Sequence, residues 1–223
     1  MSHRFILEES KQELLASLER RGIEQRVLNA IAQVPRERFV PPALLHRAYE
    51  DTSLPIGHGQ TISQPYTVAY MTQLLNVEPG HRVLEVGTGS GYQTAILCAL
   101  GATVWSIERI GELSQQARRV LNSIGYSPTL IVGDGWEGYP QAAPFDRIIV
   151  TAAAPEIPMQ LARQLAVGGI LVVPVGQNDQ HMYQLRRVSE NEFDVFSSAQ
   201  RFRFVPFIRA GHDEAASTPR AGN

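Results

Sequence analysis

A glycine-rich loop after a short apolar segment is the part of the sequence best suited to bind a ligand. Arg82–Val86 reads as a buried strand and runs directly into Gly87-Thr88-Gly89-Ser90-Gly91. Glycine permits positive φ angles and lets a ligand approach the backbone closely. A strand that passes into a helix through such a loop places the loop at the ligand-binding edge of an open parallel sheet. We therefore expect cofactor contacts from Gly87, Thr88, Gly89, Ser90 and Gly91.

The acidic residue before this loop indicates the kind of cofactor. Dinucleotide-binding loops favour Gly-x-Gly-x-x-Gly, with helix amides that face a pyrophosphate. The spacing here is Gly-x-Gly-x-Gly, and Glu85 precedes it. A carboxylate at this place would repel a pyrophosphate, but it would suit a cofactor with an amino group and a sulfonium cation. The pattern favours S-adenosylmethionine over a nicotinamide dinucleotide or another nucleotide.

Two further acids follow the next two predicted strands. Glu108 ends the second strand, where an acid accepts hydrogen bonds from ribose hydroxyls. Asp134 lies after the third strand, and we expect it and Gly135 to contact the adenine of the cofactor. Each acid alone is explained equally well as a solvated loop carboxylate. Three acids at strand ends beside one glycine loop favour a common cofactor site.

The elements that must position these residues alternate between strands and helices. Alternation of this kind predicts a parallel sheet, and fully apolar strands indicate that helices cover both of its faces. The expected fold class is α/β, a doubly wound Rossmann-like, mostly parallel sheet with N-terminal helices and antiparallel C-terminal edge strands. The expected core strands are Arg82–Val86, Val104–Ile107, Thr129–Val132, Arg147–Val150 and Ile170–Val175, with helices over Tyr92–Leu100, Glu112–Ile124 and Pro158–Leu165.

Outside this core, the two ends of the chain have their own patterns. Glu8–Val34 shows helical spacing divided by Gly22, and Tyr66–Leu75 resumes it after the long loop Asp51–Pro65. Two or three edge strands are expected within Met182–Ile208. One compact domain thus contains a helical region with the substrate loop (1–79), a cofactor-binding core (80–176), edge strands (177–210) and a flexible tail (211–223).

Composition and charge exclude several classes of function. The 223 residues are 43% hydrophobic and 19% charged, which is ordinary for a globular protein. A net charge of -2 disfavours binding to nucleic acid or to anionic lipid. The single cysteine and the lack of a signal peptide indicate a reducing compartment. We expect a cytoplasmic monomer with no metal site and no association with membranes.

Six motifs stand at Val34–Pro41, Gly59–Pro65, Glu85–Tyr92, Gly133–Gly135, Pro144–Asp146 and Phe204–Pro206. Together they resemble the protein-L-isoaspartate O-methyltransferases, a family of class I methyltransferases. The most specific of them is Thr61-Ile62-Ser63-Gln64-Pro65. The resemblance implies methyl transfer from S-adenosylmethionine to the free α-carboxylate of L-isoaspartyl residues in damaged peptides and proteins, which initiates repair through a succinimide. A class I methyltransferase acting on a small molecule or RNA is the alternative.

The chemistry implied by this resemblance needs positioning rather than a base. The acceptor carboxylate is ionised near neutral pH, so a hydroxyl that holds one of its oxygens is sufficient, and we assign this role to Ser63. A serine at this place is also a common helix N-terminal cap, and Pro65 supports a helix start there. The resemblance further implies a cofactor contact from Gln64 and substrate contacts from Thr61, Ile62, Ser63, Val175, Val205 and Pro206.

Overall fold

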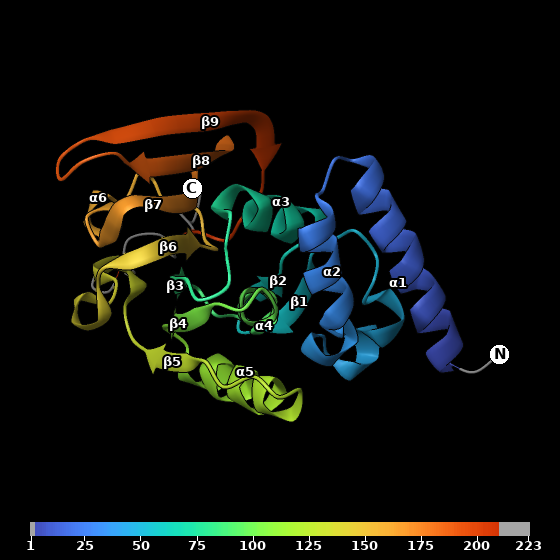
Figure 1. Ribbon diagram of the computed structural model, residues 1–223. Helices are drawn as coiled ribbons and strands as arrows, with labels where there is room; N and C mark the ends of the chain where they lie inside the picture. Colours follow the sequence, from blue (N-terminus) through green and yellow to red (C-terminus); the bar gives the residue numbers. More distant parts are fainter. Residues whose placement is uncertain (1–2, 210–223) are drawn as a thin grey trace, which may run out of the picture.

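A single mixed sheet forms the centre of the computed structural model, which describes residues 3–209. Its strand order is β5-β4-β3-β6-β7-β8-β9, seen in Figure 1 from β5 at the bottom to β9 at the top. The predicted tail 211–223 lies outside the described residues. The strands are β3 (Arg82–Val86), β4 (Thr103–Glu108), β5 (Thr129–Val132), β6 (Phe145–Val150), β7 (Leu165–Val175), β8 (Gln180–Arg187) and β9 (Phe193–Phe202).

The topology of the sheet creates a switch point between β3 and β6. β3 pairs in parallel with β4 on one side and with β6 on the other, so that Leu84 lies opposite both Trp105 and Ile148. The chain runs from β3 outward to β5 and then returns to β6. In such sheets, ligands bind beyond the carboxyl ends of the strands where the direction of winding reverses. This confirms the expected α/β fold class.

Alternating side chains on each strand form two separate cores. Val83, Ile149 and Val172 belong to the core on one face, and their neighbours Leu84 and Ile148 belong to the core on the other. Because successive side chains of a strand point to opposite faces, fully apolar strands bury both faces, as their sequences predict.

Helices cover the first of these faces in two layers. Next to the sheet, α3 (Pro65–Leu75) packs on β6 and β7, α4 (Tyr92–Ala99) on β4, and α5 (Gly111–Ser123) on β5. Outside them, α2 (Gln25–Gln33) packs on α3 and α4, and α1 (His3–Arg20) packs on α2, at the right of Figure 1. The short α6 (Met159–Ala162) packs on β7, and its buried residues belong to the core on the other face.

No described helix is both long and apolar enough to cross a bilayer.

The segment predicted as an unstructured loop over 51–65 contains a small hairpin. β1 (Leu54–Gly57) and β2 (Gln60–Ile62) pair antiparallel, with Leu54 opposite Ile62. The turn between them has positive φ at Gly57, His58 and Gly59. Leu54 and Ile56 are buried and alternate with exposed residues, so the apolar residues fix the register. The glycines and prolines that suggested a loop instead form a tight turn.

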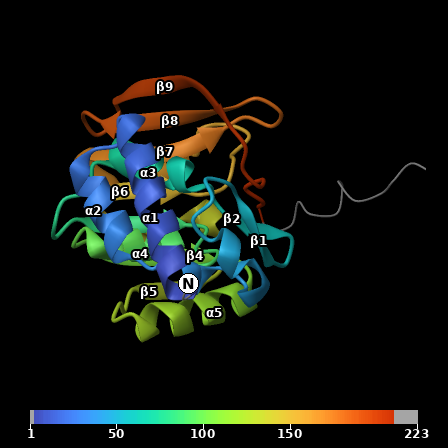
Figure 2. The same cartoon turned by 90° about the vertical axis from the view of Figure 1, so that its right-hand side faces the viewer.

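Between β7 and residue 209, the last one described, the chain forms two edge strands, within the expected two or three. The alternation over Arg201–Ile208, which suggested a third strand, does not form one, because its first two residues belong to β9. After Phe202 the chain leaves the sheet and crosses back over the carboxyl ends of the parallel strands, where the N–H of Phe207 donates to the carbonyl of Ala153 at 2.7 Å. Figure 2 shows this last segment descending from β9 beside the β1–β2 hairpin.

Two core elements also differ in length from their predictions. The helix expected over Pro158–Leu165 is only the single turn α6, and the strand expected from Ile170 already begins at Leu165. Leu165 pairs with Phe145 before an irregularity in the β6–β7 register, and Gly168 at φ +84° lies within this early part of β7. Pairing with β6 therefore extends the strand into sequence that is not apolar enough to predict it.

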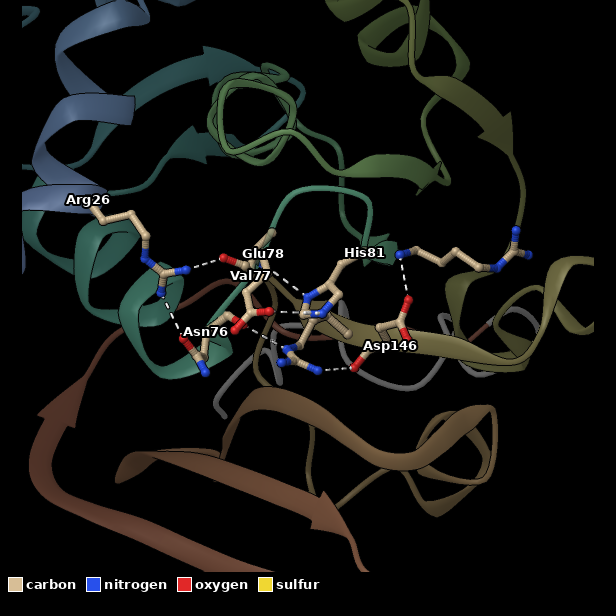
Figure 3. Close-up of polar contacts among 8 residues, drawn as sticks. Arg26, Asn76, Val77, Glu78, His81 and Asp146 are labelled. Carbon is tan, nitrogen blue, oxygen red and sulfur yellow. Dashed lines mark hydrogen bonds and ion pairs between the residues drawn. The ribbon is translucent and has the colours of Figure 1, made fainter.

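A polar cluster lies at the amino ends of β3 and β6, at the opposite end of these strands from the switch point (Figure 3). The connection from α3 to β3 turns through Asn76–His81, where the Glu78 N–H donates to Nδ1 of His81 at 3.0 Å. Arg26 of α2 donates to the Asn76 side chain at 2.8 Å and to the Val77 carbonyl. The Arg82 N–H donates to Asp146 at 2.8 Å. These contacts fix the amino ends of β3 and β6.

Candidate functional site

A cleft of about 920 Å³ lies at the switch point, beyond the carboxyl ends of β3, β4 and β6. A pocket of this size at this place is where an open α/β sheet binds its ligand. Its wall comes from the glycine loop, from β2 and the turn after it, and from the segment after β9. Eleven of the sequence-predicted site residues line it: Thr61, Ile62, Ser63, Gly87, Thr88, Gly89, Ser90, Glu108, Gly135, Val205 and Pro206.

The glycine loop needs its glycines for two reasons. Gly87 has φ +99°, and a Cβ there would lie 2.3 Å from Oγ1 of Thr151. Gly89 has φ +53°, and a Cβ there would meet only Ile56, at 3.7 Å. Gly87 thus lets β3 and β6 approach each other, whereas Gly89 keeps the cleft open in a left-handed conformation that other residues rarely adopt. Both glycines have the backbone roles that the sequence indicates.

Glu108 holds the glycine loop against the end of β4. One of its carboxylate oxygens accepts a hydrogen bond from the Gly89 N–H at 2.8 Å, and the other accepts one from the Ile110 N–H at 3.0 Å. The side chain is buried but borders the cleft. A buried carboxylate held by two backbone donors has a fixed position, and its remaining lone pairs can accept hydroxyl donors of a ligand.

Glu85 lies elsewhere than the sequence suggested. It is fully buried and is not among the residues that line the cleft. Its register partner on β4 is Ser106, and one carboxylate oxygen accepts from Ser106 at 2.6 Å and from Thr94 of α4 at 2.5 Å. Burial raises its pKa to about 7. The expected position beside the cofactor is therefore corrected, because strand alternation turns this side chain under α4, behind the loop.

The hydroxyl of Ser106 links Glu85 to the cleft indirectly. It lies 2.6 Å from the hydroxyl of Thr88, which is buried in the glycine loop and lines the cleft. Glu85, Ser106 and Thr88 thus form one hydrogen-bonded chain from the helix-covered face to the loop. Glu85 supports the shape of the loop from behind, which is a different role from direct contact with a cofactor.

Asp134 and Gly91 occupy positions at the border of the cleft. Asp134 accepts a hydrogen bond from the Trp136 N–H at 2.8 Å and precedes Gly135, which does line the cleft. Its contact with adenine stays a prediction. Gly91 is the N-terminal cap of α4 at φ +88° and is not among the lining residues. Its contact with a cofactor stays a prediction, and its backbone starts the helix.

Ser63 is half-buried and lines both the cleft and a second, neighbouring cavity, so it lies where the two cavities meet. A buried arginine fixes its backbone. Arg36 donates to the Ser63 carbonyl at 2.8 Å and to the Ala48 carbonyl at 2.8 Å, and it lies over the Tyr92 ring. Burial lowers the pKa of this guanidinium. Arg36 thus ties the loop after β2 to the N-terminal region.

Asp51, and not Ser63, caps helix α3. The N-cap position is Gln64, whose side chain makes no capping bond, while the Asp51 carboxylate accepts from the Tyr66 N–H at 2.8 Å. Pro65 stands at the first turn as expected. The alternative reading of Ser63 as a side-chain cap is therefore wrong, and its hydroxyl is left for another role. Gln64 lines the second cavity rather than the cleft and donates to Asp51 at 3.0 Å.

Five of the six predicted substrate residues, Ser63 among them, line one or both of the cavities. Thr61 and Val205 line both cavities, and Ile62 and Pro206 line the cleft. Val175 lines neither cavity; it forms an isolated bridge with Ala154 beside the sheet. Its contact with substrate stays a prediction, since the structure shows only that the last residue of β7 pairs with the segment that follows β6.

Thr151 is a site residue that the sequence reading missed. It lines both cavities, and its hydroxyl donates to the Gly87 carbonyl at 2.6 Å. It directly follows the fourth parallel strand, so the rule that selected Glu108 and Asp134 at strand ends would also have found it. Other lining residues gave no chemical signal in the sequence: Val68, Met71, Tyr92, Gln93, Ala152, Phe207 and Ile208.

The residues of the cleft fit the cofactor that the glycine spacing suggested. Among the described residues that line it, the charged side chains are Glu108 and Arg109, and lysine is absent. The buried carboxylate and the space above Gly89 suit a ligand with hydroxyls and a positive centre better than a pyrophosphate. Within the described chain, no three His, Cys, Asp or Glu side chains gather in a way that could hold a metal ion.

Comparison with known proteins places this cleft in a family. The profile described as Protein-L-isoaspartate(D-aspartate) O-methyltransferase (PCMT) matches residues 9–211. The protein-L-isoaspartate O-methyltransferase of Serratia proteamaculans (strain 568) is 54% identical over 200 residues, which are 89% of this chain and 95% of the relative. That of Christiangramia forsetii is 50% identical over 200 residues, which are 89% of this chain and 93% of the relative.

A solved structure extends the likeness to the fold. A Plasmodium falciparum protein described as a beta-aspartate methyltransferase (PCMT), in complex with S-adenosyl-L-homocysteine, superposes with a TM-score of 0.77 at 28% identity. The match covers 88% of this chain and 97% of that one. The resemblance seen in the sequence motifs is confirmed: the chain belongs to the protein-L-isoaspartate O-methyltransferase family.

Proposed function

We propose that this protein transfers the methyl group of S-adenosylmethionine to the free α-carboxylate of L-isoaspartyl residues in peptides and proteins, and so initiates their repair through a succinimide. Family membership supports this activity. The observation that carries it is the meeting of two cavities at Ser63, one lined by the glycine loop and the other by the end of β9 and the segment after it. A methyl donor and a carboxylate acceptor can then approach each other from opposite sides.

The residues around Ser63 have a limited chemical task. When bound, S-adenosylmethionine supplies an electrophilic methyl group on a sulfonium sulfur. The isoaspartyl carboxylate is already ionised at neutral pH, so the chain needs no general base. The Ser63 hydroxyl donates a hydrogen bond to one carboxylate oxygen and directs the other toward the methyl group. The oxygen–methyl bond forms as the sulfur–methyl bond breaks, and the products are a methyl ester and S-adenosylhomocysteine.

Exclusion of water is the second task, and two segments perform it. An anion that attacks a cation loses charge as the bond forms, so water would favour the separated reactants. The β1–β2 hairpin and the segment after β9 cover the cleft with Ile62, Val205 and Pro206. Val205 and Phe207 anchor this segment by hydrogen bonds to the backbone of Ala153, at 2.8 and 2.7 Å. The reacting atoms are therefore placed under apolar side chains.

A pair of peptides tests the proposed function. With labelled S-adenosylmethionine, the purified protein should methylate a peptide that contains L-isoaspartate and leave its normal aspartyl twin unlabelled. The two peptides have the same composition and charge, so the difference reports recognition of the isomerised backbone. Equal labelling of both would remove the isoaspartyl assignment, and labelling of neither would remove carboxyl methylation of peptides altogether.

Three related expectations belong to the same proposal. The partner is an isoaspartyl-containing peptide or protein, the protein acts as a monomer, and its compartment is the cytoplasm. The only thiol, Cys98, is half-buried, and burial raises its pKa to about 12, so it is a poor nucleophile at neutral pH. A chain with one inert thiol has no need of an oxidising compartment.

A further inference from the structure

The cavity beside the cofactor cleft is a polar groove of about 1100 Å³, here called the arginine groove. It shares Thr61, Ser63, Thr151 and Val205 with the cleft. If the isoaspartyl carboxylate of a peptide reaches Ser63 through this groove, the residues next to the isoaspartate must lie along the groove. The other lining residues are Arg21, Asp51, Thr52, Ser53, Gln64, Tyr66, Thr67, Gln200, Arg201, Phe202, Arg203 and Phe204.

Positive charge exceeds negative charge in this groove. Three guanidinium groups and one carboxylate line it. The carboxylate, Asp51, is already engaged: Arg21 donates to it at 2.7 Å, and the N–H of Tyr66 donates to it at 2.8 Å. Arg21 also lies over the Tyr66 ring, 3.2 Å from its centroid. Asp51 and Arg21 thus neutralise each other, and the excess positive charge comes from Arg201 and Arg203.

These two arginines differ in the contacts they already have. Nε of Arg201 lies 2.9 Å from the exposed carboxylate of Asp179. Arg203 is exposed and, among residues 3–209, makes neither a hydrogen bond nor an ion pair. It stands two residues before Val205, which borders the cleft, so their Cα atoms lie at most about 7 Å apart. Both residues line the groove. Arg203 is therefore available to a ligand that lies in the groove.

We propose that the arginine groove selects acceptor peptides with an acidic side chain close to the isoaspartyl residue, and that Arg203 is the main determinant of this selection. The inference rests on the proposed function. An extended peptide advances about 3.3 Å per residue, so an acid about two residues from the isoaspartate reaches the level of Arg203. An exposed guanidinium–carboxylate contact favours binding by about threefold and weakens with salt.

Matched peptides test this selection. Isoaspartyl peptides of one sequence carry Glu, Gln or Lys two residues before or two residues after the isoaspartate, and kcat/KM is measured for each. On one side of the isoaspartate, the Glu peptide should exceed the Gln peptide by about threefold, with the Lys peptide lower again. The difference should lie in KM and should shrink at high salt, because both charges are exposed.

Variants identify the residue responsible. Arg203→Gln should bring the Glu-to-Gln ratio close to one, and Arg203→Lys should restore part of it. Arg119→Gln is the matched control, because Arg119 is an exposed arginine on α5 that lines neither cavity, and it should keep the ratio of the unaltered protein. A ratio that survives in Arg203→Gln would overturn the assignment to Arg203.

Different kinetic results would overturn this inference and the proposed function. Equal kcat/KM for the Glu and Gln peptides in the unaltered protein, with both peptides methylated, would overturn the charge selection and leave the methyltransferase activity in place. Lack of methylation of every isoaspartyl peptide would overturn both.

Discussion

The hydroxyl of Ser106 on β4 donates to the carboxylate of Glu85 on β3 at 2.6 Å, and the two residues are register partners in the parallel ladder. The contact lies under α4, where Thr94 donates to the same oxygen. The other carboxylate oxygen of Glu85 is buried without a hydrogen-bond partner. An acid in this setting is stabilised in its protonated form, since burial disfavours the charge more than the two hydroxyls favour it.

Stability should therefore depend on pH through Glu85. Its folded pKa, about 7, lies above the ordinary glutamate pKa of 4.5, so its contribution is present below the unfolded pKa and is lost as pH rises through 7. Between pH 5 and pH 8 the loss is on the order of 2 kcal/mol. Glu85→Gln cannot titrate and should lack this dependence. Urea unfolding of both proteins at the two pH values measures the difference, and identical pH dependence in the two would contradict the prediction.

Ser63→Ala should reduce turnover while cofactor affinity stays nearly intact. Loss of a hydrogen bond to a charged acceptor costs about 1.5–3 kcal/mol, so kcat for an isoaspartyl peptide should fall by roughly ten- to a hundredfold. Calorimetry with S-adenosylhomocysteine measures the affinity separately. Ser10→Ala, on the outer helix α1, is the control, and its turnover should not change. A loss of cofactor binding in Ser63→Ala without loss of kcat would move Ser63 to the cofactor site.

Glu108→Ala should have the opposite effect. The carboxylate fixes the glycine loop through Gly89 and, as we propose, accepts the ribose hydroxyls, so its removal should weaken cofactor binding at least tenfold. At saturating cofactor, kcat should fall much less. Glu112→Ala, an exposed acid in the first turn of α5, is the matched control. Unchanged cofactor affinity in Glu108→Ala would show that the carboxylate only supports the loop.

Asp51→Ala should destabilise the protein and displace Ser63. Loss of the cap of α3 alone costs about 1 kcal/mol, and the partners Arg21 and Gln64 lose their acceptor as well. Asp51→Asn keeps an oxygen for the Tyr66 N–H and should cost less. Thermal or urea unfolding ranks the two variants. If both were equally stable, the capping bond would contribute nothing.

His81 should make the fold sensitive to acid. Its pKa is lowered, first by burial and then by the nearby Arg147, while Asp146 and Glu78 act in the other direction. Because the neutral ring accepts from the Glu78 N–H (Figure 3), the stability it provides is present above the unfolded pKa of about 6.5 and is lost as pH falls below it. His81→Asn retains an acceptor but cannot titrate. Urea unfolding at pH 7.5 and 5.5 should show a smaller loss in this variant.

Local patterns in the sequence were sufficient for most of the fold. Period-two and helical spacing predicted the five parallel strands and the helices α2 to α5, because those residues bury side chains on faces fixed by backbone geometry. The hairpin at 54–62 was missed, since its glycines and prolines also suit an irregular loop. Two of the two or three expected edge strands formed, and the third did not, because alternation in Arg201–Phe204 also suits a segment that lines a groove.

The sequence by itself determined the glycine loop, the acid Glu108 at the next strand end and the segment that carries Ser63, because each depends on residue types at short spacing. Only the tertiary structure decided that Glu85 lies behind the loop, that Asp51 caps α3, and that Thr151 and Val205 meet at Ser63. These relationships join residues that are 15 to more than 100 positions apart in the sequence. Which of them come into contact depends on the register of the strands and on the path of the segment after β9 across the sheet.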